Sequence, residues 1–187
     1  MGASLQRCRR ALAAPAAPQP HIKPPCVDEE ISFTADQQYE LYIDGSAVGS
    51  LPNANTWQVA KRTTMLSTAK VLAFKATRIE GRDGGLLVSG SRFVTDGSWK
   101  CTNKYEKGWS GVNFDDSAWP RAVVIGNHGM NPWGYIPDIS NASKWIWTTK
   151  YIYGQETDII IYCRKTRGNL THRYPYALIG FVPEAPI

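Results

Sequence analysis

The sequence lacks the run of roughly 18 or more apolar residues that a membrane-spanning helix requires. It also lacks a GxSxG nucleophile motif, a phosphate-binding loop and an HExxH zinc motif. Its four cysteines show no CxxC spacing and only three histidines could join them, so a zinc site is not expected. The sequence therefore predicts neither an integral membrane protein nor an enzyme with a recognisable catalytic or metal centre.

Positive charge is scarce in the central part of the chain, although the formal net charge of the 187 residues is +5. Residues 1–26 carry a net charge of +4 and residues 164–187 carry +3, which leaves −2 for residues 27–163. A slightly acidic folded part offers no electrostatic footprint for phosphate, so we expect no nucleic-acid partner there. The basic ends are the only candidates for such attraction, and solvated tails are the simpler interpretation.

The two ends of the chain differ in composition from its centre. Residues 1–26 are rich in Ala and Pro and show no sustained hydrophobic period, which predicts a flexible basic leader. Residues 27–166 carry strand-like patterns and are expected to form one β-sandwich domain, with residues 167–187 as a C-terminal tail. The residues leave open whether the leader is native or a truncated start, and whether the chain is a fragment of a larger protein.

Short segments of alternating hydrophobicity, separated by turn residues, follow one another through the predicted domain. Residues 31–35 and 38–43 each predict a strand, and Asp44-Gly45 predicts a tight hairpin turn into residues 46–49. Residues 70–77 are nearly all apolar, which is typical of a central strand covered on both sides. Further strands are expected at residues 86–89, 92–95, 122–125 and 158–164. Since no convincing amphipathic helix appears, the sequence predicts an all-β fold, an antiparallel β-sandwich of the jelly-roll type.

A series of fragments follows in a recognisable order between residues 34 and 134: TADQQYELYIDGSAVG, Trp57, VLAFKAT, GGLLVSG, TDGSWKC, FDDSAW and GNHGMNPWG. Together they resemble the galactose-binding-like jelly-roll domains that are attached to glycoside hydrolases such as β-galactosidases and α-rhamnosidases, and that also occur in lectin-like extracellular proteins. Gln37 and Asp44 depart from the family pattern, which has Asn at both positions. Asp tolerates the same left-handed turn geometry as Asn, so the expected fold is unchanged.

The resemblance implies a sugar-binding domain and, in some members of the family, a structural calcium ion. Asp36, Asp96 and Asp116 are oxygen donors, but no calcium-loop spacing is present, so the metal stays unassigned and no other cofactor is expected. The partners that the resemblance implies are free carbohydrates or the glycans of glycoproteins.

A sugar site needs a flat aromatic ring on which the C–H face of the sugar can stack, with polar side chains at its edge. Candidate residues lie in expected loops: Trp133 beside Asn127 and His128, Trp109 beside Asn103 and Lys107, and the pair Arg82 and Asp83 as hydroxyl-binding groups. For Trp109 and Trp133 a place in the core is an equally good interpretation. Four other tryptophans occur in these segments, and most of them are expected to pack inward: Trp99, Trp119, Trp145 and Trp147.

Two further features indicate an extracellular or cell-surface protein. Cys101 follows a short strand and Cys163 lies in the last strand, so we expect a disulfide bond between them. Asn141 and Asn169 each begin an Asn-X-Ser/Thr glycosylation sequon. Disulfides and glycans are typical of oxidising compartments.

The adjacent carboxylates Asp115 and Asp116 are not expected to form a catalytic pair, because neighbouring residues on an extended strand point in opposite directions. A turn before Trp119 is the preferred interpretation. The sequence thus favours a non-catalytic carbohydrate-binding domain. Two alternatives stay open, an extracellular protein-interaction or matrix module without a sugar site, and an accessory domain of a larger glycoside hydrolase.

Overall fold

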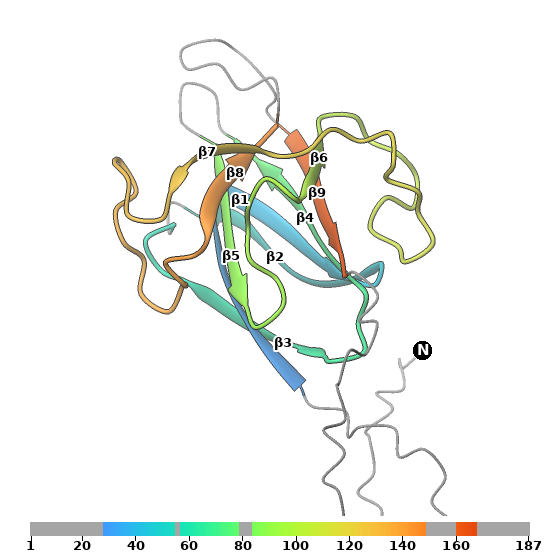
Figure 1. Cartoon of the computed structure of the whole chain (residues 1–187), viewed down its shortest axis with the longest axis horizontal. Coiled ribbons are helices and arrows are strands. Elements are labelled where there is room, and N and C mark those ends of the chain that lie inside the picture. The colour runs from blue at the N-terminus through green and yellow to red at the C-terminus, as the bar shows by residue number, and fades with distance from the viewer. Residues whose placement is uncertain (1–27, 55–56, 79–83, 149–159, 168–187) are drawn as a thin grey trace, which may run out of the picture.

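The computed structural model describes residues 28–54, 57–78, 84–148 and 160–167. These residues form strands, turns and loops without a helix, and every pair of neighbouring strands is antiparallel (Figure 1). The strands of the described residues are β1 (Asp28–Ile43), β2 (Ser46–Ala54), β3 (Lys61–Leu66), β4 (Val71–Thr77), β5 (Gly85–Gly90), β6 (Lys100–Thr102), β7 (Val123–Asn127), β8 (Lys144–Trp147) and β9 (Ile160–Thr166). The predicted all-β, antiparallel class is confirmed.

The first strand, β1, belongs to two sheets (Figure 1). Its N-terminal part pairs with β3 and β5, and its C-terminal part pairs with β2 and β4. Gln37 lies between the two parts with a φ of 94°, and the register against β2 shifts just after it. Such an irregularity lets a strand bend from one sheet into the next. The prediction of two separate strands here was therefore wrong, because the chain stays extended through the bend.

The strands build two sheets that share β1. Sheet A has the order β3-β1-β5-β8-β7, and sheet B has the order β2-β1-β4-β9-β6. The inner faces of the two sheets enclose one core. The two sheets thus form an antiparallel β-sandwich, as the jelly-roll pattern predicts. The larger side chains of this core are Ile31, Phe33, Leu41, Leu72, Phe74, Leu86, Phe93, Trp99, Ile146 and Trp147. As predicted, β4 lies centrally, between β1 and β9, and its first four residues are buried.

The hairpin between β1 and β2 turns at Asp44 and Gly45, as predicted. Both residues have positive φ, 49° and 87°, the left-handed conformation that Asp and Gly adopt at low cost. The carboxylate of Asp44 has a second role, because its Oδ1 accepts the N–H groups of Lys70 and Val71 at 2.8 Å each. One side chain thus fixes the hairpin and the start of β4.

Two strand predictions need correction. Residues 92–95 do not form a strand; Val94 makes only an isolated bridge to Ser89 on β5. Conversely, β3 was missed because its sequence KRTTML shows little alternation of apolar residues, and only Met65 on it is buried. Pairing with β1 holds β3 at the sheet edge, where Lys and Thr can face solvent.

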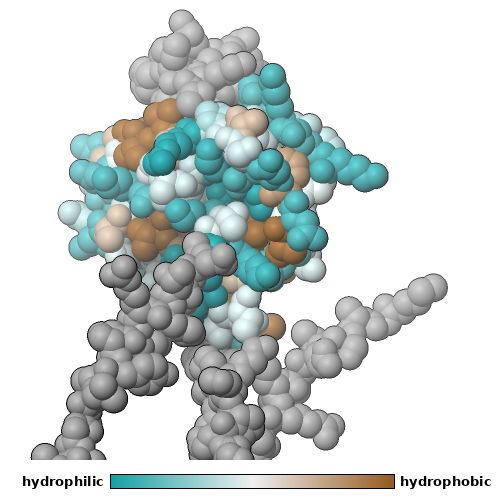
Figure 2. All heavy atoms as spheres, turned by 45° about the vertical axis from the view of Figure 1, so that its right-hand side comes forward, coloured by the Kyte–Doolittle hydropathy of each residue, from teal (hydrophilic) through white to brown (hydrophobic). Residues whose placement is uncertain are grey.

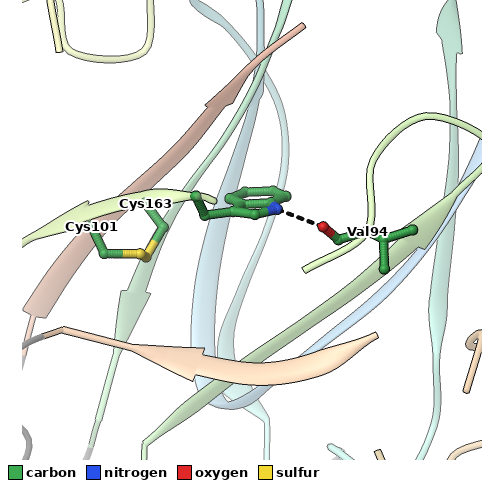
Figure 3. The surroundings of a disulfide bond; sticks show 4 residues. Val94, Cys101 and Cys163 are labelled. Carbon is green, nitrogen blue, oxygen red and sulfur yellow. Dashed lines mark hydrogen bonds between the residues drawn. A yellow bond between two sulfur atoms is a disulfide. The ribbon is translucent and has the colours of Figure 1, made fainter. Parts of the chain in front are cut away.

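The predicted disulfide is present. Cys101 on β6 faces Cys163 on β9 directly across the ladder, with their Cα atoms 4.1 Å apart (Figure 3). Beside it, the indole N–H of Trp99 donates to the carbonyl of Val94 at 2.9 Å (Figure 3). Because β6 has only three residues, this covalent bond fastens a strand that few hydrogen bonds could hold.

Replacing both cysteines by alanine should lower the free energy of unfolding by about 4 kcal/mol, because the bond closes a long loop in the unfolded chain. Urea unfolding of the double variant, followed by tryptophan fluorescence, measures the change. Unfolding the unaltered protein in a reducing agent is the matched control and should give a similar loss. Unfolding midpoints that coincide in all three samples would contradict the prediction.

Candidate functional site

The outer face of each sheet is covered in part by a loop that carries buried tryptophan. The sheet-B loop (residues 103–122) joins β6 to β7, and the sheet-A loop (residues 128–143) joins β7 to β8; the two lie on opposite sides of the molecule in Figure 1. Each loop builds a small apolar cluster on its sheet. The sheet-B cluster contains Val71, Ala73, Trp109, Trp119 and Tyr162, and the sheet-A cluster contains Leu87, Trp133, Ile136, Ile139 and Trp145.

Trp133 does not offer an exposed stacking ring. It is only 4% exposed, and its ring stacks on Trp145 with the centroids 4.5 Å apart. Its indole N–H donates to Oδ2 of Asp36 at 2.8 Å, so Asp36 supports the loop from β1 and does not cap a turn. Of the two interpretations that the sequence left open for this ring, its burial supports a place in the core, where it covers the apolar outer face of sheet A.

The two polar residues that were predicted to lie beside Trp133 differ in their burial. His128 is buried, and its Nε2 accepts the N–H of Ile136 at 2.8 Å, so this imidazole closes the sheet-A loop and does not face solvent. The imidazole that was predicted to bind sugar hydroxyls is therefore almost fully buried in this structure. Asn127 is exposed at the end of β7.

Trp109 is likewise buried, at 5% exposure. It stacks on Trp119, with an interplanar angle of 18°, and meets the rings of Tyr42 and Tyr162 edge-on. As for Trp133, its burial supports the interpretation as a core residue over that of an exposed stacking ring. Lys107 is exposed and Asn103 half-buried on the same loop.

Other predictions about side chains have mixed outcomes. The expected inward packing of Trp99, Trp119, Trp145 and Trp147 is confirmed, since each is at most 5% exposed. Asn141 is exposed in a turn of the sheet-A loop. Arg82, Asp83 and Asn169 lie outside the described residues.

Arg164 on β9 anchors the sheet-B loop from below. Its side chain is 1% exposed, forms a 2.6 Å ion pair with Asp116, and donates to the carbonyls of Phe114 and Gly111. Burial lowers the pKa of Arg164. Asp115 instead accepts the N–H of Ser117 at 2.9 Å, which lowers the pKa of Asp115. The interpretation of this pair as part of a turn is confirmed.

Replacing Arg164 by Met should lower the free energy of unfolding by about 3 kcal/mol, because it leaves a carboxylate and two loop carbonyls without their donor. Arg121→Met is the matched control, since Arg121 is exposed at the end of the same loop. Chemical denaturation of both variants tests this expectation. Equal stability of the two variants would mean that Arg164 does not hold the loop.

Beyond the edge of the sheet-B loop, the outer face of sheet B carries four aligned residues. We call Ser50, Glu40, Lys75 and Tyr162 the sheet-B row, because they face one another in register across β2, β1, β4 and β9. Lys75 Nζ lies 2.6 Å from Oε1 of Glu40, and the hydroxyl of Tyr42 donates to Oε2 at 2.6 Å. The two middle residues of the row, Glu40 and Lys75, thus form a hydrogen-bonded ion pair that is partly accessible to solvent.

An exposed aromatic ring borders this row. Tyr105, in the sheet-B loop, is 65% exposed and packs on Tyr162 with the ring centroids 5.7 Å apart. The sequence signal for this arrangement was present but not used: Glu40 is the charged residue within residues 38–43, and Lys75 is the charged residue of β4. Only the strand register could place them opposite each other.

Hydrogen bonding fixes the charge state of the row. The hydrogen bonds from Lys75 and then Tyr42 lower the pKa of Glu40, so this carboxyl is ionised at neutral pH. The hydrogen bond to Glu40, helped by burial, raises the pKa of Tyr42 to about 12. The phenol therefore stays protonated, and Glu40 and Lys75 cancel each other's charge.

An alkaline titration should find one phenol that ionises near pH 12, well above an ordinary tyrosine. Because the folded-state pKa of Tyr42 is raised, its contribution to stability is complete below about pH 10 and is lost as the pH rises towards 12. Ultraviolet absorbance of tyrosinate measures the step, and Tyr42→Phe should remove it. A step that persists in that variant would assign it to another tyrosine.

The aspartates considered for calcium have other partners. Asp36 accepts from Trp133, Asp96 from Ser98, and Asp116 pairs with Arg164. Across the described residues, no group of three or more His, Cys, Asp or Glu side chains is placed to hold a metal ion. The described part of the chain also contains no helix with the length and hydrophobicity to cross a membrane.

Comparison with known proteins finds sequence similarity to an α-L-rhamnosidase. An α-L-rhamnosidase from Streptomyces avermitilis is 28% identical over 130 residues, which cover 61% of this chain and 13% of the rhamnosidase. The chain is similar to a short part of an α-L-rhamnosidase. A solved structure of Streptomyces avermitilis α-L-rhamnosidase complexed with L-rhamnose shares 22% identity with a TM-score of 0.42, covering 62% of this chain and 13% of that one.

No protein-family model matches the sequence. The resemblance to α-rhamnosidase domains that the motif order predicts is confirmed by the sequence match, at low identity and over part of the chain. The chain spans only 13% of the rhamnosidase.

Proposed function

We propose that this chain is a non-catalytic carbohydrate-binding module of the kind attached to glycoside hydrolases. The observation that carries the proposal is the extent of the match, which covers most of this chain but only 13% of an α-L-rhamnosidase. A shared segment of 130 residues has the size of one domain. A rhamnosidase that retains such a segment outside its catalytic machinery would use it to hold the enzyme on its substrate.

The chemistry of the acidic residues supports binding without catalysis. Glycoside hydrolases need two carboxyl groups facing one cleft, about 5 to 10 Å apart, one of them able to give up a proton. Here Asp115 is held in a turn by Ser117, and Asp116 is ion-paired with the buried Arg164. Both carboxylates are therefore engaged in holding the sheet-B loop.

A second candidate function is an extracellular protein-interaction module. The burial of Trp109 and Trp133 favours it, because the two rings that would best have served a sugar are inside the loops. The visible surface favours it less: hydrophilic residues surround several small, separate hydrophobic patches on the face drawn in Figure 2. Patches of this kind are ordinary on a soluble domain and do not require a protein partner.

We further propose that the module works outside the cell or at its surface. The disulfide between Cys101 and Cys163 supports this location, because disulfides persist in oxidising compartments. The exposed sequon at Asn141 supports it as well, since a glycan needs room at the surface. A periodate-sensitive mass increase at Asn141 in secreted protein would add direct support.

The folded protein should bind a neutral sugar weakly, with a free energy of about −4 to −8 kcal/mol, because a shallow site buries little of its ligand. Isothermal titration calorimetry with L-rhamnose, galactose and glucose, with and without calcium, measures this affinity. A chromogenic rhamnoside should stay intact under the same conditions. Hydrolysis that Asp115→Asn or Asp116→Asn abolishes would replace the proposal by an enzyme, and a glycan array without any bound glycan would favour the protein-interaction module.

A further inference from the structure

The sheet-B row lies across several strands at one level of the sheet. The register places Ser50 opposite Glu40, Glu40 opposite Lys75, and Lys75 opposite Tyr162. Neighbouring strands are about 4.8 Å apart, so the row extends over about 14 Å. This length exceeds one sugar ring, and a polar line of this kind suits an extended ligand better than a compact one.

The polar groups of the row keep free hydrogen-bonding capacity. Each carboxylate oxygen of Glu40 accepts one hydrogen bond, from Lys75 or from Tyr42, and each has a second lone pair. The ammonium of Lys75 has further donors besides the one directed at Glu40. The side chains of Glu40 and Lys75 are 40% and 29% exposed, so a ligand can reach them. Sugar hydroxyls, which donate and accept, match this combination.

The exposed ring of Tyr105 is held in place by its neighbours in the chain. The side chain of Glu106 accepts the indole N–H of Trp119 at 2.7 Å, and the carbonyl of Glu106 accepts the N–H of Trp109. On the other side, the N–H of Lys104 donates to Thr102 at the end of β6. An aromatic ring fixed in this way loses little conformational entropy when a ligand stacks on it.

We propose that a neutral oligosaccharide binds along the sheet-B row, with one sugar ring stacked on Tyr105 and its hydroxyls bonded to Glu40 and Lys75. This proposal rests on the carbohydrate-binding function proposed above and gives that function a place and a ligand class. The ligand is neutral because Glu40 and Lys75 neutralise each other, so that an acidic sugar would face the carboxylate as well as the ammonium. The buried tryptophans form the floor and the frame of the site, and Tyr105 provides the contact surface.

The chain offers a matched control for Tyr105. Tyr135 is 73% exposed in the sheet-A loop, on the opposite side of the sandwich, and its ring packs on His128. The two residues are therefore both tyrosines, are similarly exposed, and lie in the sheet-B loop and the sheet-A loop, respectively. They differ in their surroundings, since only Tyr105 borders the sheet-B row.

The experiment compares four proteins by calorimetry with galactobiose and with an α-linked rhamnose disaccharide: the unaltered chain, Tyr105→Ala, Tyr105→Phe and Tyr135→Ala. Tyr105→Ala should lower the association constant about tenfold, the order of magnitude of one aromatic contact. Tyr105→Phe keeps the ring and should keep most of the affinity, and Tyr135→Ala should leave it unchanged. Thermal melting of each variant verifies the fold, because Tyr105 packs on the buried Tyr162 and Tyr135 packs on the buried His128.

The outcomes separate this proposal from the broader one. Binding that survives Tyr105→Ala but disappears in Tyr135→Ala would overturn the sheet-B site and leave the carbohydrate-binding function standing. Binding restricted to acidic disaccharides and lost in Lys75→Gln would overturn the neutral ligand class. If the folded unaltered chain binds no disaccharide, both proposals fail. Amide chemical shifts in NMR that move on β1, β4 and β9 upon titration, and not in the sheet-A loop, would support the site independently of any variant.

Discussion

The crossing of β1 from sheet A into sheet B is the constraint on which the remaining structure depends. Alternate residues of β1 on both sides of Gln37 turn toward the core, so a single strand supplies apolar side chains to the whole sandwich; they are Ile31, Phe33, Ala35, Tyr39, Leu41 and Ile43. The bend at Gln37 brings the two sheets face to face without ending the strand. The alternate residues point outward, and two of them accept hydrogen bonds there. Asp36 accepts from Trp133 in the loop over sheet A, and Glu40 accepts from Lys75 on the face of sheet B.

The two loops that cover the sheets bury their tryptophans, and this burial determines which aromatic rings are exposed at the surface. An indole is mostly apolar but has one N–H that needs an acceptor when it is buried. Three indoles have such an acceptor: a carboxylate of β1 for Trp133, the side chain of Glu106 for Trp119 and the carbonyl of Val94 for Trp99. The buried indole N–H groups of Trp145 and Trp147 have no hydrogen-bond partner among the described residues. Because the tryptophans of the loops are buried in this way, the exposed aromatic rings of the described residues are those of Tyr105 and Tyr135, whose hydroxyls tolerate water.

The physical character of the sheet-B face agrees with a module that holds a substrate for a neighbouring enzyme. Its charged groups neutralise each other, its aromatic ring is fixed, and its polar groups lie on strands instead of on mobile loops. Strand-borne groups keep their spacing, which favours recognition of a repeating ligand, and a shallow face favours rapid release. Weak, reversible attachment would let a hydrolase remain near a polysaccharide without being immobilised on it.

The sequence by itself determined the β class, the Asp44-Gly45 hairpin, the central position of β4, the disulfide and the resemblance to rhamnosidase domains, because each depends on local residue patterns or on a motif order. Tertiary structure decided what the patterns could not: which face of a loop its tryptophans occupy and which strands stand side by side. Gly84 and Gly85 illustrate the difference, since an added Cβ would lie 2.7 Å from the rings of Trp147 and Trp145, a contact that no spacing in the chain reveals. For the same reason the sequence left the burial of Trp109 and Trp133 open, and Glu40 and Lys75, 35 residues apart, become neighbours only through the strand register.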